Sequence, residues 1–488
     1  MKEPILSLIE RANSYVSSIV WGMPMILLIL GTGVLMTVRT RAIQLTRAAQ
    51  VLRLTVIPTL KGITRRQPRR SGAVSPFEAF ATAIAGTVGT GNIIGVVSAI
   101  LTAGPGAVFW MWVSAFFGMA TNYAENVLGI YYRRREPSGG YSGGAFYYIA
   151  YGVGRQGAAF AAAVFCILAS FGMSGVQTNK IAVTVAGAVS DILPLSSVDR
   201  TRLIVGVGVA AVTALVILGG IRRIGRVAAM TVPALSVVFI LLSTATVLMH
   251  LKGVPGVFSM IFSSAFSVRS AGGGILGYTF AQTVRKGMAR GVFSNEAGLG
   301  SSVIAHSASD TDEPVVQGMW GVFEVFFDTF VICTLTALMF LLTFDTGALC
   351  ADMEDSAMAM AMFSNNFGGF GTAAFSVMLP LFAFTSVLAW AYYGEKAVGF
   401  CFRSLKEIWR PLPVTLFRLC YVLVIAASTC VKSDLVWAID DTCNGLMAVP
   451  NLIALVALSG SVARITENYF DRQRGLKVKP MRSAYPES

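Results

Sequence analysis

The chain of 488 residues has few charged side chains, and this scarcity excludes most classes of soluble protein. Charged residues make up 13% of the sequence, hydrophobic residues make up 55%, and the mean hydropathy is +0.67. A soluble domain does not need that much apolar surface. A large buried core would also give short apolar runs rather than spans of about 20 residues. The composition therefore predicts an all-α integral membrane protein.

Histidines, paired cysteines and nucleotide-binding motifs are also scarce or missing. Two histidines, His250 and His306, are too few for a His-rich metal site, and without a Gly-Lys dipeptide there is no Walker A lysine. The seven cysteines form no C-x-x-C pair, and their odd number argues against a disulfide framework. No Ser/His/Asp constellation is visible. We therefore expect no enzyme, no cofactor and no direct ATP-driven pump.

The formal charge of +13 comes from Lys and Arg that lie mostly between the apolar spans. This placement sets membrane orientation and does not indicate a nucleic-acid partner. The segment 39–70 alone holds nine Lys and Arg, whereas the loop 344–368 holds four acidic residues and no basic one. With about eleven spans, the basic segments all fall on one side, which is the cytoplasm. We expect a multi-pass protein of the cell (inner) membrane, with its N-terminus outside and its C-terminus in the cytoplasm.

About eleven apolar segments are long enough to be transmembrane helices. The first is long enough to span and precedes dense positive charge, so we interpret it as a retained helix rather than a signal peptide. The other ten divide into five and five, which gives an inverted repeat. The predicted parts are 1–74 (first helix and basic loop), 75–250 and 251–462 (five helices each) and 463–488 (basic tail). Segments 41–57 and 255–268 look peripheral. The predicted spans are 16–38, 75–101, 106–132, 157–187, 203–220, 227–250, 274–308, 315–343, 369–394, 413–431 and 435–460.

Two Gly-rich stretches that contain Asn interrupt apolar segments at matching places in the two halves. They are 86–92 (GTVGTGN) and 291–300 (GVFSNEAGLG). Backbone can unwind at membrane depth only where protein or a polar cavity satisfies its hydrogen bonds. Freed N–H groups suit a carboxylate, and freed carbonyls suit Na⁺. Paired breaks point to the site of a secondary transporter, although close helix packing by small residues is the alternative for each break alone.

Ionisable side chains inside the apolar segments are further candidates for function. Glu296 either takes part in transport or forms an ion pair with the basic cluster at 285–290. Glu324 and Asp328, at i and i+4, share a helix face. They form either a proton or cation path or a salt bridge to the same basic cluster. We expect Glu125 to pair with Arg133–Arg135 as a gate or anchor.

Hydroxyl and amide groups within the spans have two possible roles. Thr385 and Ser386 either donate to carbonyls of their own helix or supply two oxygens to a hard cation. Trp390, one turn further on, could close a small pocket. Gln177 and Asn179 either contact substrate or bond between helices.

Five stretches then carry a family resemblance. They are GTVGTGNIIGV at 86–96, GPGAVFWMW at 104–112, GVFSNEAGLGSSVIAHS at 291–307, AFTSVLAWAYYGE at 383–395 and NGLMAVPNLIAL at 444–455. In this order they resemble the alanine/glycine:cation symporter family, the sodium:alanine symporters. The resemblance implies a fold similar to the leucine transporter, with discontinuous first and sixth core helices. It also implies sodium-coupled uptake of small neutral amino acids, with sodium as a co-transported ligand.

The resemblance also implies roles for individual residues. The first break, with Gly89, Gly91 and Asn92, contacts substrate and sodium, and the pair Thr385 and Ser386 completes a sodium site. The predicted substrate-binding residues are Gly89, Thr90, Gly91, Gln177, Phe293, Asn295 and Trp390; the predicted sodium ligands are Ala85, Val88, Asn92, Thr385 and Ser386; the candidate gate or coupling residues are Glu125, Glu296, Glu324 and Asp328.

The chain departs from the family pattern at four positions. Ala145 stands where proline is expected, and Asn122 stands where lysine is usual, which bears on gating or stability. Ala389 and Ala391 flank Trp390 where glycine and serine are commoner. The last two lie near the expected pocket and put alanine or glycine as the preferred substrate in doubt.

The leading hypothesis is a sodium-driven importer of small neutral amino acids that works by alternating access. Proton coupling through Glu296, Glu324 or Asp328 is one alternative. Another is a transporter-like sensor that binds an amino acid without moving it and uses the segments 39–70 and 464–488 as partner surfaces. No obligate protein partner is evident.

We predict that Thr385→Val and Ser386→Ala raise the sodium concentration for half-maximal uptake. A methyl group cannot replace a hydroxyl oxygen in a cation's shell, and such a loss costs roughly 1–3 kcal/mol. This corresponds to about 5- to 150-fold weaker sodium affinity. The measurement is sodium-dependent uptake at matched expression. Wild-type sodium dependence in both variants would mean that the hydroxyls bond only to their own helix.

Overall fold

The computed structural model describes residues 2–60, 72–136, 139–192, 198–266, 280–344, 354–431 and 433–485. These parts of the chain form a helical bundle with one small antiparallel sheet, in which β1 (Arg134–Arg135) pairs with β2 (Tyr141–Ser142). The helices up to residue 265 are α1 (Lys2–Val20), α2 (Met23–Arg39), α3 (Ile43–Thr46), α4 (Ala48–Leu54), α5 (Val56–Leu60), α6 (Pro76–Thr87), η1 (Gly91–Gly95), α7 (Val96–Ala103), α8 (Gly106–Tyr132), α9 (Ala145–Tyr148), η2 (Ile149–Val153), α10 (Gln156–Ile192), α11 (Val198–Ile217), α12 (Gly220–Met249), η3 (Leu251–Gly253) and α13 (Val254–Ala265). The later helices are α14 (Phe280–Asn295), α15 (Ser302–His306), α16 (Pro314–Val325), η4 (Phe326–Cys333), α17 (Thr334–Thr343), α18 (Asp355–Cys401), η6 (Glu407–Trp409), α19 (Pro411–Ser428) and α20 (Ser433–Gln473).

The helices confirm a protein with multiple apolar spans. Within the described ranges, seven helices are long and apolar enough to cross a membrane, and the number rises to nine if each of two bent pairs is one span. The predicted spans 106–132 and 274–308 correspond to α8 and to α14 with α15. The total of eleven spans stays a prediction, as do the boundaries of the two repeats.

Two expectations about helix continuity are wrong. The first apolar run is bent by 41° between α1 and α2. The helix is interrupted at Trp21 and Gly22, and Pro24, in the first turn of α2, has no N–H to donate to the preceding turn. The predicted loop 344–368 is also partly helical, since α18 begins at Asp355 and continues through a kink at Gly368, where φ is +58°. Asp345 and Asp352 of that loop lie outside the described residues.

The start of α6 shows how local sequence sets a helix boundary. Ser75 accepts a hydrogen bond from the Glu78 N–H at 3.2 Å, and the Glu78 carboxylate accepts one from the Ser75 N–H at 2.9 Å. Pro76 occupies the first turn, where a missing N–H costs nothing. This capping box fixes the point from which α6 runs to the first break.

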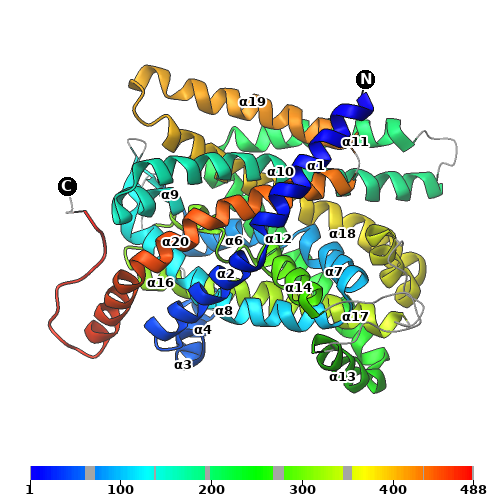
Figure 1. Ribbon diagram of the computed structural model, residues 1–488, viewed down its shortest axis with the longest axis horizontal. Helices are drawn as coiled ribbons and strands as arrows, with labels where there is room; N and C mark the ends of the chain where they lie inside the picture. Colours follow the sequence, from blue (N-terminus) through cyan, green and yellow to red (C-terminus); the bar gives the residue numbers. More distant parts are fainter. Residues whose placement is uncertain are drawn as a thin grey trace.

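Helices from the two halves of the chain interleave around the broken segments (Figure 1). The long helix α10 packs against α18 and α20, and α8 packs against α16 and α14. The helix α6 packs against α12, α18 and α15. Both breaks are therefore enclosed by protein, as unwound backbone in a membrane requires.

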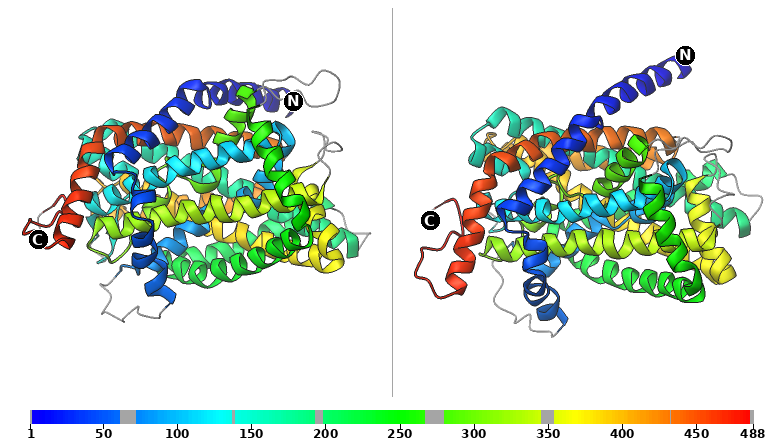
Figure 2. Two further views of the ribbon diagram at one scale, coloured as in Figure 1. Left: turned by 90° about the horizontal axis from the view of Figure 1, so that it is seen from below. Right: turned by 60° about the horizontal axis from the view of Figure 1, so that its bottom comes forward.

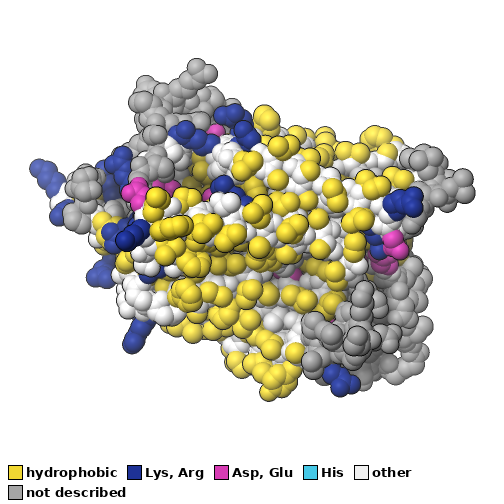
Figure 3. Space-filling view, turned by 90° about the horizontal axis from the view of Figure 1, so that it is seen from above, with side chains coloured by type: hydrophobic (Ala, Val, Ile, Leu, Met, Phe, Trp, Pro, Cys, Tyr) yellow, Lys and Arg dark blue, Asp and Glu magenta, His cyan; other side chains and the backbone are white. Residues whose placement is uncertain are grey.

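The surface separates apolar and basic regions. Hydrophobic side chains cover the middle of the face in Figure 3, and most Lys and Arg visible there lie toward the left end, which is the end that carries the C-terminus in Figure 1. The N-terminal helix α1 projects from the body in Figure 2. An apolar belt with basic side chains at one end is typical of a multi-pass membrane protein.

The C-terminal tail folds back onto the bundle through ion pairs. Glu313 binds Arg472 at 2.7 Å and Arg482 at 2.7 Å, and the Ala484 N–H donates to the Tyr131 carbonyl at 2.9 Å. Burial favours a higher pKa for Glu313, but the hydrogen bonds and positive charges of Arg472 and Arg482 outweigh it and lower the pKa. The carboxylate therefore stays ionised under ordinary conditions and holds the tail.

Glu313→Gln should release the tail, because the neutral amide loses both arginine pairs. The pairs are partly exposed and contribute about 1 kcal/mol, so tryptic cleavage after residue 473 should become roughly five-fold faster. Because the pKa of Glu313 is lowered, this docking should persist from neutral pH down through the ordinary glutamate range of about 4.3 and be lost only below it. Hydrogen exchange of the wild-type tail from pH 7 down to about pH 3 tests the second point, because the range must include the ordinary glutamate pKa and values below it.

Glu467→Gln is the matched control, since Glu467 forms an exposed pair with Arg41 and does not contact the tail pairs. Equal cleavage rates for Glu313→Gln and wild type would show that other contacts hold the tail.

Candidate functional site

The first break separates α6 from η1. The chain bends by 50° between Pro76–Thr87 and Gly91–Ala103. The Gly89 N–H donates to Asn92 Oδ1 at 3.0 Å, and the Thr90 N–H donates to Gln177 Oε1 at 3.2 Å. Side chains therefore replace the missing helical acceptors. Gly89, Thr90, Asn92 and Gln177, four of the predicted ligand-binding residues, meet here and are buried.

Gly89 is needed because two other helices approach its Cα. A Cβ at this position would lie 2.6 Å from Ser386 Oγ and 3.0 Å from both polar atoms of the Gln177 amide. The backbone φ of Gly89 is not positive, so close approach rather than chain reversal explains the glycine. The first break, α10 and α18 thus converge at one place.

The hydroxyls of Thr385 and Ser386 both donate to the Phe382 carbonyl, at 2.8 and 3.3 Å. Each oxygen keeps lone pairs for a cation while its proton is donated. Ala85 lies in the last turn of α6, and Val88 follows it in extended conformation. Carbonyls in a last helical turn lack intrahelical partners. The structure therefore brings Ser386 to the first break, while binding of sodium by this set stays a prediction.

The second break separates α14 from α15 and contains left-handed backbone. Glu296 has φ +55°, and Gly298 and Gly300 have φ +93° and +75°. A non-glycine residue in this region is strained and persists only where surrounding contacts hold it. Glu125 of α8 supplies such contacts, because its carboxylate accepts from the Gly300 N–H at 3.0 Å and from the Gly298 N–H at 3.4 Å.

Asn451 of α20 completes this support. Its amide nitrogen donates to Glu125 and, at 2.9 Å, to the Gly298 carbonyl. The expected pairing of Glu125 with Arg133–Arg135 is therefore wrong. Glu125 lies two turns inside α8, where the unwound N–H groups bind it, whereas Arg133 donates to carbonyls that follow α15, including that of Ser307.

Glu296 faces α6 and α18. One carboxylate oxygen accepts from Ser301 Oγ, and the other lies 3.2 Å from the point where a Gly86 Cβ would stand. The Tyr393 hydroxyl lies 2.8 Å from the same point, and its ring is 5.3 Å from that of Trp390. The alternative of an ion pair with the basic cluster at 285–290 is wrong, because left-handed Glu296 turns its side chain away from the outer turns of α14.

Asn92, Ser294 and Asp328 form a buried polar cluster that connects the two broken segments. Asn92 Nδ2 donates to Asp328 Oδ1 at 2.6 Å and to Ser294 Oγ at 2.9 Å. Ser294 Oγ donates to Asp328 Oδ2 at 2.8 Å. Thr329 also donates to Asp328 Oδ2, at 3.0 Å, and accepts from Asn295 Nδ2 at 3.0 Å. One carboxylate from η4 thus joins the first break to the end of α14.

Glu324 belongs to a different cluster. Its carboxylate lies 2.7 Å from His306 Nε2, and Gln317 bonds to the other ring nitrogen of His306. The i, i+4 spacing does not give Glu324 and Asp328 a shared set of partners, because the π-helix η4 begins at Phe326 and rotates Asp328. The alternative of a salt bridge to the cluster at 285–290 is wrong, because Glu324 binds His306 and Asp328 binds Asn92 and Ser294.

An aromatic and ionic stack adjoins α14 and α20. The rings of Phe293 and Trp437 lie 5.0 Å apart, and Arg290 lies 4.6 Å from the Trp437 ring and 3.4 Å from Asp441. Phe293 also approaches Gly91, where a Cβ would meet its ring at 3.0 Å. Neither Trp437 nor Asp441 was predicted from the sequence, although two adjacent acids inside an apolar span, Asp440 and Asp441, were a signal for the second.

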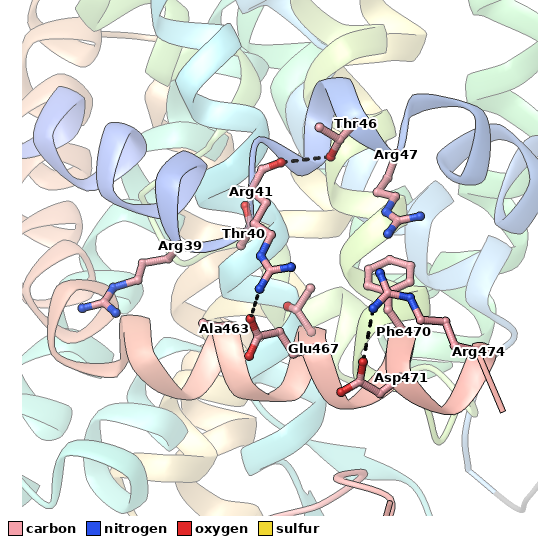
Figure 4. Close-up of a pocket in the computed structure, with 11 residues that line it drawn as sticks. Arg39, Thr40, Arg41, Thr46, Arg47, Ala463, Glu467, Phe470, Asp471 and Arg474 are labelled. Carbon is pink, nitrogen blue, oxygen red and sulfur yellow. Dashed lines mark hydrogen bonds and ion pairs between the residues drawn. The ribbon is translucent and has the colours of Figure 1, made fainter. Parts of the chain in front are cut away.

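A cleft of about 530 Å³ lies apart from these residues, between the segment 39–47 and the end of α20. Figure 4 shows Arg41 beside Glu467 and Arg474 beside Asp471 in this cleft. None of the predicted substrate or sodium residues lines it. We therefore assign the candidate site to the two breaks and not to the cleft.

Solved structures with similar folds are transporters. MhsT in complex with L-phenylalanine aligns with a TM-score of 0.57 over 82% of this chain and 99% of that chain, at 13% identity. A Na⁺-coupled sialic acid symporter aligns with a TM-score of 0.53 over 91% of this chain and 93% of that one, at 12% identity. At these identities the likeness shows the fold alone, and it confirms the expected similarity to the leucine transporter.

Sequence comparisons cover nearly the whole chain. The sodium:alanine symporter family matches residues 6–483. The Sodium/alanine symporter AgcS of Methanococcus maripaludis is 39% identical over 95% of this chain and 97% of its own length. The probable sodium/glutamine symporter GlnT of Bacillus subtilis is 32% identical over 96% of this chain and 92% of its own length. The chain belongs to the sodium:alanine symporter family and is a cation-coupled amino-acid symporter rather than an enzyme.

Proposed function

We propose that this protein uses the sodium gradient to import small neutral amino acids, alanine or glycine first. The observation that carries the proposal is the cluster of Asn92, Ser294 and Asp328 between the two breaks. Asp328 is buried and hydrogen-bonded only to neutral groups in the described residues. A buried carboxylate without a cationic partner is costly. A sodium ion beside it would remove that cost and would contact both broken segments at once.

The substrate would bind beside this cluster. Gly89, Thr90 and Gly91 present backbone N–H groups that suit a carboxylate. A substrate carboxylate would replace Gln177 as the acceptor of the Thr90 N–H. Phe293 would close the pocket on one side; Asn295 and Trp390 complete the proposed substrate set. The close approach at Gly89 favours a small substrate.

The sodium ligands would come from two places. Ala85, Val88, Thr385 and Ser386 form one set where α6 and α18 meet, and Asn92 with Asp328 forms the other. Glu125 and Glu296 would hold the second break as gate residues. We propose a cell-membrane location, with an outer N-terminus and a cytoplasmic C-terminus, from the basic segments that favour the cytoplasmic side.

Proton coupling is the second candidate, and the buried pair of His306 and Glu324 favours it. A relative from Bacillus subtilis, 33% identical over 95% of this chain, is described as a putative sodium/proton-dependent alanine carrier. Uptake driven by a pH gradient in sodium-free buffer would favour this candidate.

Purified protein in proteoliposomes tests the main proposal. Labelled alanine, glycine and glutamine should accumulate under an inward sodium gradient and not in choline buffer. Exchange that does not depend on sodium would overturn the coupling, and accumulation of glutamine alone would overturn the preferred substrate.

Asp328→Asn should weaken sodium dependence while keeping the shape of the cluster. The amide can still accept from Asn92, but it lacks the charge that a cation needs. Hydrogen bonds to charged groups contribute about 1.5–3 kcal/mol, so the half-maximal sodium concentration should rise roughly 10- to 150-fold. Asp471→Asn, in the tail region, is the control and should behave like wild type. An unchanged sodium midpoint in Asp328→Asn would remove Asp328 from the site.

Gly89→Ala should reduce uptake to roughly a tenth or less. The added Cβ would lie 2.6 Å from Ser386 Oγ and would displace the Ser386 and Gln177 side chains, whose positions the proposed site requires. Gly95→Ala is the matched control in the same segment, since a Cβ there has no neighbour within 4 Å. Initial uptake rates at equal surface expression give the comparison. Equal rates for the two variants would contradict a ligand site at Gly89.

A further inference from the structure

Asp440 and Asn444 form an unexplained polar pair inside α20. They are spaced i, i+4, and their exposed fractions are 0% and 1%. In the part of the chain that the structure describes, the Asp440 carboxylate and the Asn444 amide have no hydrogen-bond partner outside the pair itself. A buried carboxylate in this condition loses its hydration without a compensating bond from outside the pair. The pair therefore needs a partner that the chain itself does not supply.

A glycine on the neighbouring helix allows close packing against Asp440. A Cβ at Gly172 of α10 would lie 2.9 Å from Asp440 Oδ1 and 3.1 Å from its Cα. Gly172 stands on the same helix as Gln177, which binds the first break. Asp440 thus packs directly against the helix that lines the proposed substrate site.

Two of the three charged groups around Asp440 are acidic. The charged groups that interact with it are Asp441, Arg290 and Glu296. Of these, Arg290 is engaged by Asp441 at 3.4 Å and by the Trp437 ring at 4.6 Å. Asp440 is one turn along α20 from Trp437 and so lies next to the aromatic stack. With Asp441 and Glu296 as acidic neighbours, this place attracts a cation and repels an anion.

The donor set favours a single positive charge. Within the described ranges, no group of three or more His, Cys, Asp or Glu side chains could hold a metal ion, and divalent ions need several such ligands. One carboxylate with one amide oxygen suits Na⁺ or an ammonium group. The oxygen atoms of the pair can coordinate Na⁺ or accept hydrogen bonds from an ammonium group.

We propose that Asp440 and Asn444 form a subsite for a monovalent cationic group, separate from the sets at Thr385 and Ser386 and at Asn92 and Asp328. The occupant is either Na⁺ or the ammonium group of the transported amino acid. The inference rests on the proposed function, because that function brings both groups to this part of the protein.

Asp440→Asn and Asn444→Ala test the subsite in the purified full-length protein in detergent. Because the two side chains have no hydrogen-bond partner outside the pair, neither change should lower the ligand-free melting temperature, and Asp440→Asn should raise it by removing a buried carboxylate without a cationic partner. Gly172→Ala is a third variant that narrows the space. Gly175→Ala is its matched control on the same helix, since a Cβ there would meet Val436 Cγ1 at 3.3 Å and Ser428 Cβ at 3.5 Å.

Sodium chloride is first titrated in a choline chloride background without amino acid, with thermal stability as the readout. Alanine is then titrated at saturating sodium. A sodium midpoint about ten-fold higher in Asp440→Asn and Gly172→Ala identifies Na⁺ as the occupant. An unchanged sodium midpoint with about ten-fold weaker alanine binding identifies the ammonium group.

Wild-type midpoints in all three variants would overturn the subsite and leave the proposed function intact. A lower ligand-free melting temperature in Asp440→Asn would also overturn it, since the carboxylate would then serve the fold. A wild-type protein that responds to neither sodium nor alanine would overturn the proposed function, and the subsite with it.

Discussion

The constraint on which the structure depends is the need of unwound backbone for hydrogen-bond partners at membrane depth. Water is scarce there, so each freed N–H and carbonyl must find protein or ligand. Glu125 and Asn451 meet this need at the second break, and Asn92 and Gln177 meet it at the first. These four side chains come from α8, α20, η1 and α10. The arrangement of long helices around the breaks follows from having to deliver these groups, and the same requirement explains why polar residues sit deep in apolar helices.

The buried carboxylates in this interior have different hydrogen-bond partners. Glu125 supports the second break, Asp328 joins the two broken segments, and Glu324 pairs with His306. The Asp328 carboxylate is bound by side-chain donors and remains available to a cation, whereas the Glu125 carboxylate holds the freed backbone N–H groups of Gly298 and Gly300 and is committed to structure. By this reasoning Asp328 is the better candidate for ion coupling, and Glu125 is the better candidate for a gate.

Much of the fold could be predicted from the sequence, because apolar length and basic loops report directly on membrane spans. Both breaks could also be recognised in the sequence, but the residues at which they begin and end could not. Gly291 continues α14 instead of ending it, since its glycine serves close packing against Ser114 of α8. The partner of Glu125 was predicted wrongly because spacing along one helix was used as a guide to contact, whereas its true partner Asn451 lies on another helix, far away in the sequence. For Glu296 and Glu324 the ion-pair alternatives failed, because these side chains contact Ser301 and His306 instead. Trp437 was overlooked because nothing local in an apolar span shows what faces it, whereas the adjacent acids Asp440 and Asp441 were a signal that could have been used.

The hydrogen bonds at the breaks also constrain how the protein can move. A half-helix that tilts relative to α8 or α20 must give up bonds to Glu125 or Asn451, and the freed backbone groups then need other partners. A ligand can shift such an equilibrium only by the difference in its affinity for the two states. A carboxylate bound to the Thr90 N–H and a cation bound to Asp328 would each supply partners to groups that the protein otherwise satisfies by itself. Both would act on the segments joined by Asn92 and Ser294. Coupling between ion and substrate then follows from shared partners, because each ligand stabilises the backbone geometry that the other requires, and such coupling is reciprocal.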